Sequence, residues 1–472
     1  MADTVVPAAS ASPPAPERLS LSSKLAFGAG DLSPGMAALV IGFFQALFLT
    51  TVAGLSPGAV GIILLLGRVW DAITDPFMGM ISDRTRSRFG RRRFWLLVGA
   101  VPFGILYFLL WWVPPFADIG TFFYYLVVIL AFNTIYTVVN VPYTSLTAEL
   151  TSDYDERTSL NSFRFAFSIG GSLLIGILHG VFVTRFCADP TACRPGESQA
   201  GYMLSAAIFG IVMIFPFFWA VAGTRERYTP GAESTMPPSI IAQLKVAVQN
   251  RPFLFVIGIY LCSWMALQIT QNVIGFYLTF YLRRADLFPI VLLAVQGSAM
   301  LFLFIWSAVS RQIGKQNTYY AGMIFWIAVM AGLFFVGPEQ ITLVLILAFL
   351  AGVGIATAYL VPWSMLPDVV DLDELNTGQR REGIFYGVMT FTQKTCVGLG
   401  IALTLQALQW YGFNGNLLPG QQPESALLAL RWMIGPVPTV ILLIGIFLVW
   451  RYPLTKARHA EILATLAERK AA

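Results

Sequence analysis

The stretch Gly67–Trp95, GRVWDAITDPFMGMISDRTRSRFGRRRFW, joins an apolar helical segment to a basic turn. Its apolar part nevertheless carries Arg68, Asp71 and Asp75. At 3.6 residues per turn the two acids lie one above the other on one helix face, with the arginine close to the same stripe. Two neighbouring carboxylates in a membrane require a cation or protons. The stretch therefore predicts a cation-coupling site; the alternative is a structural Arg68–Asp71 ion pair with Asp75 facing water.

The composition around this stretch is that of an integral membrane protein. Of 472 residues, 57% are hydrophobic and 12% charged, against about 45–50% and 25% in soluble domains. A hydrocarbon core of about 30 Å takes about 20 helical residues. About twelve segments qualify, which predicts an all-α fold; they are 24–53, 57–81, 94–113, 120–148, 158–184, 200–222, 252–282, 287–310, 317–336, 340–366, 383–411 and 425–450.

An internal echo divides the chain into two halves. ISDRTRSRFGRRR at 81–93 is followed by VSRQIGKQ at 309–316, each after the second span of its half. We expect a disordered tail at 1–23, a six-helix bundle at 24–223, a connection at 224–251, a second six-helix bundle at 252–451 and a tail at 452–472. The last segment is open between an amphipathic helix and a loose tail.

The formal charge of +5 is spread over short connections, which excludes a nucleic-acid-binding domain. Basic residues crowd 84–93 and 451–470, so the positive-inside rule predicts that both termini are cytoplasmic; Arg283 and Arg284 are exceptions. We expect a multi-pass protein of the plasma membrane, the inner membrane in a bacterium, and a monomer. Cys187 and Cys193 share a loop predicted to lie outside, where a disulfide and two free thiols both remain open.

Further polar side chains interrupt other spans. Asp31 follows Gly28 and Gly30 in GAGD, and Arg164 lies inside the fifth span. A polar stripe in the fourth span can line a solute path or bond to neighbouring helices; it consists of Tyr136, Thr137, Asn140, Tyr143 and Thr144. In the eleventh span Thr390 and Gln393 precede Lys394, which can hold a solute or compensate one of the acids at Asp31, Asp71 and Asp75. His179 is interpreted as structural.

The loop at 79–93 matches the loop signature of the major facilitator superfamily. An acid at a helix end and arginines in the turn can form and break ion pairs as two bundles rock. The predicted conformational loop consists of Gly79, Asp83, Arg84, Gly90, Arg91 and Arg92.

Nearly the whole chain resembles one family, the melibiose-permease-like glycoside–pentoside–hexuronide cation symporters. The matching blocks are GAGD at 28–31, RVWDAITDP at 68–76, NVPYTSLTAELTSDYDERT at 140–158, PDVVD at 367–371 and QK at 393–394. The resemblance implies two bundles with alternating access. It places a cation site, suited to Na⁺ or H⁺, on Asp71, Thr74, Asp75 and Thr137.

The same resemblance matches Asp31, Arg164 and Lys394 to solute-binding residues. Thr74 replaces an asparagine, which leaves the choice between Na⁺ and H⁺ open. The acid and tryptophans that grip galactosides are replaced by Asn140, Thr144 and Tyr359, so a melibiose-like galactoside is not expected. The predicted solute site comprises Asp31, Tyr136, Asn140, Thr144, Arg164, Tyr359, Thr390, Gln393 and Lys394.

The sequence thus predicts a Na⁺- or H⁺-coupled symporter of a sugar, glycoside or uronate, with the lipid bilayer as its surroundings and no cofactor beyond the coupling ion. The alternative within the same fold is a carrier of lysophospholipids or other amphiphiles. A receptor or scaffold without transport is a third interpretation, which the buried charges disfavour. An enzyme is not expected, because no nucleophile–base constellation, metal-ligand cluster or phosphate loop is found in the sequence.

Overall fold

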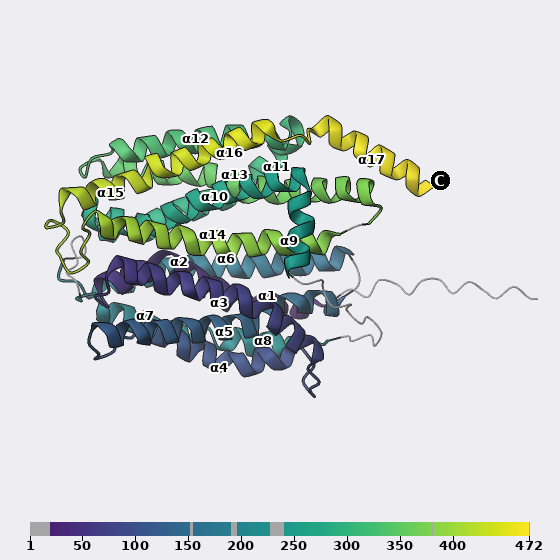
Figure 1. The fold of residues 1–472 in the computed structure, drawn as a ribbon. Coiled ribbons are helices and arrows are strands. Elements are labelled where there is room, and N and C mark those ends of the chain that lie inside the picture. Colours follow the sequence, from purple (N-terminus) through teal and green to yellow (C-terminus); the bar gives the residue numbers. More distant parts are fainter. Residues whose placement is uncertain (1–18, 152–153, 190–195, 227–239, 380, 472) are drawn as a thin grey trace, which may run out of the picture.

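The helices of this protein form two bundles that run along a common direction (Figure 1). The computed structural model describes residues 19–151, 154–189, 196–226, 240–379 and 381–471. Every regular element in these ranges is helical. The first half of the chain, coloured purple to blue in Figure 1, forms one bundle, and the second half, green to yellow, forms the other. The predicted all-α class is confirmed.

The first half contains the helices of the first six predicted spans. They are α1 (Leu21–Ala29), α2 (Leu32–Thr51), α3 (Pro57–Arg84), α4 (Arg93–Leu109), α5 (Asp118–Leu150), α6 (Tyr154–Arg185), α7 (Gln199–Val212) and α8 (Phe215–Gly223).

The central connection contains α9 (Ile240–Gln249), and the second half follows it. Its elements are α10 (Arg251–Phe276), the π-helix η1 (Tyr277–Tyr281), the short 3₁₀ helix η2 (Ala285–Leu287), α11 (Phe288–Ile313), α12 (Lys315–Phe335), α13 (Ile341–Thr377), α14 (Glu382–Trp410), α15 (Glu424–Ile434), α16 (Pro436–Arg451) and α17 (Lys456–Ala471). In the described residues eleven spans are long and apolar enough to cross a membrane, and α4 adds a shorter apolar helix.

Three predicted spans are each built from two helices. The first breaks at Asp31, which is the N-cap of α2. The sixth and twelfth break before Pro216 and Pro436, each in the first turn of the following helix. Proline has no N–H for the preceding turn, so a helix tends to restart where it occurs.

The structure corrects two boundaries of the prediction and decides one open alternative. The tenth span does not end at 366 in an acid-rich turn: α13 continues to Thr377 and stops at Gly378, whose φ of +69° is the left-handed conformation that glycine adopts at helix ends. The segment 452–472 contains a helix, α17, which buries Ile462 and Leu466. Helix α1 begins at Leu21, so the predicted tail at 1–23 is too long; residues 1–18 lie outside the described ones.

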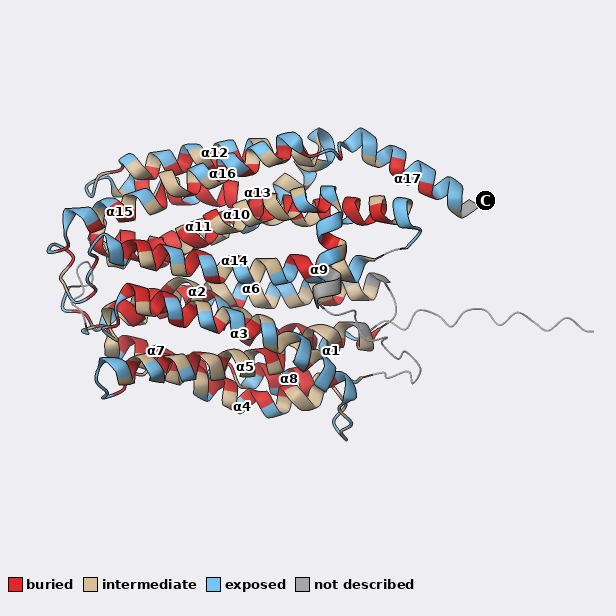
Figure 2. Cartoon of the chain, in the orientation of Figure 1, coloured by how far each residue is buried: buried red, intermediate tan, exposed pale blue. Residues whose placement is uncertain are grey.

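Buried residues line the inner faces of both bundles, whereas exposed residues cover their outer faces (Figure 2). Many exposed side chains are large and apolar, among them Phe215, Phe335 and Trp450. In a soluble protein such a surface would aggregate. On a bundle of spanning helices it is the surface that contacts lipid tails, where the backbone is satisfied within each helix.

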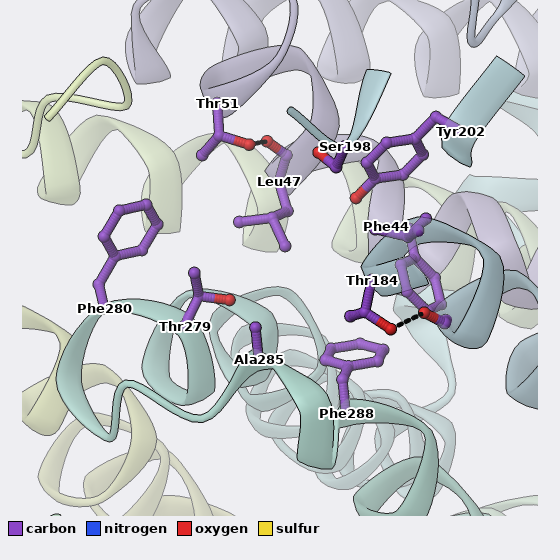
Figure 3. A pocket seen from close by; sticks show the side chains of 12 residues that line it. Phe44, Leu47, Thr51, Thr184, Ser198, Tyr202, Thr279, Phe280, Ala285 and Phe288 are labelled. Atoms are coloured by element: carbon purple, nitrogen blue, oxygen red, sulfur yellow. Dashed lines mark hydrogen bonds between the residues drawn. The ribbon is translucent and has the colours of Figure 1, made fainter. Parts of the chain in front are cut away.

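At one end of the molecule the two bundles pack directly against each other. We call the end that carries 84–93 and α17 the basic end, at the right of Figure 1, and the other the opposite end. At the opposite end the Gly58 amide donates to Gln409 Oε1 at 2.5 Å, and the rings of Phe44 and Phe288 lie 4.4 Å apart. Figure 3 shows the cavity of about 60 Å³ that remains between α2, α6 and α7 on one side and η1, η2 and α11 on the other.

At the basic end the predicted conformational loop forms an ion-pair network. Arg92 bonds Asp83 at 2.5 Å and Glu149 at 2.7 Å, and Arg91 bonds Glu149 at 2.7 Å. These contacts tie α3, the loop and α5 together. Gly90 has a φ of +100°, and a Cβ there would meet the carboxylate of Glu226.

Glu226, which the sequence analysis did not single out, caps the start of α4. Its carboxylate accepts hydrogen bonds from the backbone N–H groups of Arg91 at 2.7 Å, Arg92 at 2.9 Å and Arg93 at 2.7 Å. Helix N-termini have unsatisfied N–H groups and a positive partial charge, so a carboxylate there is stabilising. The chain beyond α8 is thereby attached to the loop between α3 and α4.

We therefore expect Glu226→Ala to destabilise the protein by about 1–3 kcal/mol, because several charge-assisted hydrogen bonds are lost at once. The melting temperature of the purified protein measures this loss. Glu461→Ala is the matched control, since Glu461 pairs with Arg458 at the exposed surface. Equal melting temperatures for the two variants would contradict the capping role.

Candidate cation and solute site

The two acids of α3 share one hydroxyl donated from α5. The Thr137 hydroxyl lies 3.0 Å from Asp71 Oδ1 and 2.9 Å from Asp75 Oδ1. The hydroxyl of Thr74 lies 3.4 Å from that of Thr137. The four predicted cation-site residues therefore lie together, and all of their side-chain polar atoms are oxygens. Hard oxygen ligands suit Na⁺, and carboxylates also accept protons.

Lys394 reaches this cluster from the other half of the chain. Its ammonium lies 3.0 Å from Asp71 Oδ2 and also bonds Asp75 Oδ2. The ammonium and the two carboxylates thus belong to α14 of the second bundle and α3 of the first. From the sequence, Lys394 is interpreted either as a solute-binding residue or as a cation that compensates one of the acids. The observed geometry corresponds to the second interpretation.

The structure corrects the alternative in which Arg68 neutralises Asp71, because that carboxylate is paired with Lys394. Arg68 instead packs beside Gly398 and lines a small cavity of about 20 Å³. Three amide side chains line the same cavity, Gln45, Asn133 and Asn272. Sequence reasoning missed these amides, although each is an isolated polar residue within an apolar span.

A second charged pair lies in the first bundle, where Arg164 Nε of α6 donates to Asp31 Oδ2 at 3.1 Å. Asp31 is buried, with 7% of its surface exposed. Its position depends on close helix packing, since a Cβ on Gly28 would lie 3.0 Å from the backbone of Phe163. The glycine thus allows α1 to approach α6, which brings the acid within reach of the arginine.

Tyr136 lies on α5 and packs against Phe103 and Phe132, with 6.2 Å and 6.3 Å between ring centroids. Asn140 on the same helix is half-buried, and the hydroxyl of Thr144 donates to Val141 O of its own helix at 3.0 Å.

The remaining predicted residues belong to the second bundle. Tyr359 packs against Trp264 with 5.6 Å between ring centroids and lines an apolar cavity of about 60 Å³. Gln393 is half-buried beside Lys394. Thr390 is exposed and donates to Tyr386 O of its own helix at 3.0 Å. Tyr359 thus lies on α13, and Thr390 and Gln393 lie on α14 of the same bundle. Asn140 and Thr144 lie on α5 of the other bundle. The structure assigns no ligand to these side chains.

Two further predictions concern the opposite end. His179 is fully buried, its Nδ1 lies 2.7 Å from the Ser205 hydroxyl, and it packs between aromatic rings, which agrees with a structural residue. Cys187 is disulfide-bonded; Cys193 lies outside the described residues.

The chain can now be compared with known proteins. A family model described as MFS/sugar transport protein matches residues 26–456. The chain belongs to this family. Its members are transporters, and the predicted major facilitator fold is confirmed. The inward open structure of the xylose transporter XylE from E. coli matches with a TM-score of 0.62 and 17% identity, over 94% of this chain and 99% of that one.

Two relatives of known sequence cover nearly the whole chain. An uncharacterized symporter of Synechocystis sp. is 39% identical over 96% of this chain and 98% of its own. The sodium-dependent lysophosphatidylcholine symporter 1 of Gallus gallus is 28% identical over 94% of this chain and 89% of its own. The relatives therefore support a symporter of the major facilitator type.

The buried pair Asp31–Arg164 generates a stability prediction. We expect Asp31→Asn or Arg164→Gln alone to cost about 3 kcal/mol, because each leaves an uncompensated charge in the membrane domain. The double variant should cost less than the sum, since neither charge then remains alone. Melting temperatures of the three variants measure this; additive losses would contradict the pairing.

Proposed function

We propose that this protein is a cation-coupled symporter that carries a solute with an anionic or zwitterionic group by alternating access. One observation carries the proposal: an ammonium from the second bundle, Lys394, lies on an acid pair of the first bundle. Ion binding at that pair must therefore alter a contact between the two bundles.

The mechanism follows from competition for the acid pair. Na⁺ or a proton that binds Asp71 and Asp75 takes over the charge compensation that Lys394 supplies. The ammonium is then free for another partner, and the contact between α3 and α14 weakens. A change at one small site thereby biases the packing of two rigid bundles, which is the kind of element that alternating access requires.

Charge balance points to the solute. The charged residues of the membrane domain described above are three carboxylates (Asp31, Asp71 and Asp75) and three cations, namely Arg164 and Lys394, which pair with those acids, and Arg68 in the small amide-lined cavity. These formal charges cancel. One bound cation leaves a net charge of +1 in a medium of low dielectric, where an uncompensated charge is costly. A solute with an anionic group restores neutrality. By linkage the cation and the solute should each tighten the binding of the other.

Lysophospholipid-like amphiphiles are the leading candidates for this solute. Relatives named for lysophosphatidylcholine match 94% of the chain, and an apolar cavity adjoins Tyr359 in the second bundle. The residues expected to grip a galactoside are replaced at Asn140 and Thr144. A uronate or other sugar is the second candidate, supported by the description of the family and by the blocks that resemble glycoside–pentoside–hexuronide symporters.

Orientation and membrane are part of the same proposal. The basic end is the cytoplasmic one by the positive-inside rule. The contacts between the bundles at the opposite end support an inward-facing state in this orientation.

Loss of the acid pair should abolish coupling. We expect Asp71→Asn and Asp75→Asn to lose accumulation against a gradient, because the coupling cation then has no carboxylate pair to bind. Uptake into proteoliposomes under an imposed Na⁺ or H⁺ gradient measures this, with labelled lysophospholipids and uronates tested side by side. Asp118→Asn, in the first turn of α5 and away from the site, is the control. Intact accumulation in both pair variants would exclude the proposal.

Removal of the tethered ammonium should strengthen cation binding. We expect Lys394→Met to bind Na⁺ at least about tenfold more tightly than the wild type, because Na⁺ no longer competes with the side chain. Melting temperature titrated with Na⁺ at constant ionic strength, with choline as the replacement ion, gives the affinity by mass action.

Lys394→Arg is the matched variant, because it retains a cation at the same position and should keep Na⁺ binding weak. The melting temperature is also measured at two pH values. If Lys394→Met changes the dependence of melting temperature on pH but not on Na⁺, the coupling ion is H⁺. Unchanged binding of both ions in that variant would rule out the competition.

A further inference from the structure

A further cavity lies at the basic end, apart from the cation site, and its volume exceeds that of the cavities described above. It has a volume of about 430 Å³ and lies where α11, α12, α13 and α17 meet. This volume is within the usual range of small-molecule sites, about 300–1,000 Å³. Figure 1 shows α17 extending from this corner of the second bundle.

The lining of this cavity is cationic. Arg311, Lys315 and Lys456 contribute three positive charges to the lining and Asp368 one negative charge, and the lining residue His459 also contacts the carboxylate of Asp371 at 3.0 Å. The carboxylate of Asp368 is already bonded by Lys315 at 2.7 Å and lies 3.5 Å from His459 Nε2. Arg311 and Lys456 are exposed at its rim. A cation-lined concave site of this kind attracts anions.

A buried hydroxyl in the lining lacks an acceptor. Tyr452 is 4% exposed and lines the cavity, and its hydroxyl has no hydrogen-bond partner among the described residues. Buried polar groups are nearly always hydrogen-bonded, and an orphaned one costs about 1–3 kcal/mol. The hydroxyl oxygen has less than 1 Å² of accessible surface, so Tyr452 lines the cavity with its other atoms and the rim cations are the groups that an anion in the cavity can reach.

The other half of the protein shows what occupies the corresponding position there. Helix α4 is the third span of its half, and the Glu226 carboxylate covers its N-terminus. Glu226 is the third residue after the end of α8; the third residue after the end of α16 is Leu454, which lines the cavity beside the start of α12. The connection also runs past this helix start, because Gln316 donates to Tyr452 O at 3.1 Å. The second half thus replaces an internal carboxylate by an apolar residue and a cavity.

We propose that this cavity binds an oxyanion, a phosphate group carried by a lipid headgroup or by a small soluble molecule, that takes the place which Glu226 has in the first half. Arg311 and Lys456 would hold it. Because α17 supplies Lys456 and His459, the bound anion would attach the C-terminal helix to the second bundle.

The test uses the full-length protein in nanodiscs and two probes. In the first arm, nanodiscs of neutral phosphatidylcholine are titrated with inorganic phosphate at constant ionic strength. In the second arm, phosphatidylglycerol replaces part of the neutral lipid and retained lipid is counted by native mass spectrometry. Melting temperature reports binding in both arms. A response to phosphate identifies a soluble ligand, and a response to phosphatidylglycerol alone identifies the lipid.

Three variants make the test specific. Arg311→Gln/Lys456→Gln should weaken binding at least about tenfold, because two charged donors are lost. Tyr452→Phe should leave anion binding unchanged and the melting temperature without anion unchanged or higher, since it removes an unsatisfied buried hydroxyl that the cavity does not reach. Arg458→Gln is the matched control, because this exposed residue of α17 pairs with Glu461 outside the cavity lining; it should bind like the wild type.

Two results would overturn the proposal. Phosphate stabilises many proteins through exclusion from their surface, so an equal rise of melting temperature in the wild type and the double variant would show only this general effect. The absence of any response to phosphate and to phosphatidylglycerol in the wild type would show that the cavity holds no oxyanion.

Discussion

The contact between Lys394 and the acid pair of α3 is the constraint on which the rest of this site depends. Among the described residues neither Asp71 nor Asp75 has another cationic partner, and all three groups lie within spanning helices. Charges buried together are tolerated only when they compensate one another. Since the ammonium and the carboxylates come from different halves, charge compensation and bundle packing are one and the same interaction. An ion that enters here necessarily acts on both.

Glycines and small residues make this contact possible. Gly398 lies one turn from Lys394 on α14, and a Cβ there would come within 3.0 Å of the Arg68 side chain. Gly61 on α3 faces Ala402 in the same way, at 3.3 Å. Small side chains let two membrane helices approach closely enough for a single lysine to reach across. The helix pair that closes the opposite end therefore also sets the distance between the charges.

The two halves repeat one architecture but differ at their basic ends. In the first half Arg92 joins Asp83 and Glu149, and Glu226 covers the start of α4. In the second half Lys315 joins Asp368, and a cavity lies at the start of α12. Each pair of charges holds a loop against the neighbouring long helix. The repeat thus conserves the ion pair as a mechanical element, whereas the group that satisfies the helix N-terminus changes from half to half.

Much of this organisation follows from the sequence alone. Apolar length fixes the number of spans, because a spanning segment has to satisfy its own backbone in lipid, and helical periodicity places Asp71 above Asp75. The blocks from GAGD to QK lead to the transporter family at its coarser level, MFS/sugar transport, and not specifically to the glycoside–pentoside–hexuronide symporters. Local signals also end helices wrongly: the span predicted to end at 366 continues to Thr377, where Lys315 pairs with Asp368, Arg381 pairs with Asp373 and His459 Nε2 lies 3.0 Å from Asp371.

Partner choice, in contrast, is decided by the tertiary structure. Arg68 precedes Asp71 by three residues and is the obvious partner on one helix, yet Lys394, 323 positions further along the chain, takes that role. Likewise no local pattern connects Asp31 with Arg164 or Glu226 with the start of α4. The sequence determines which charges enter the membrane, since the free-energy cost of burying a charge depends on its own position in a span. Which charges form pairs depends on how helices that are distant in the sequence pack together, and only the tertiary structure shows this.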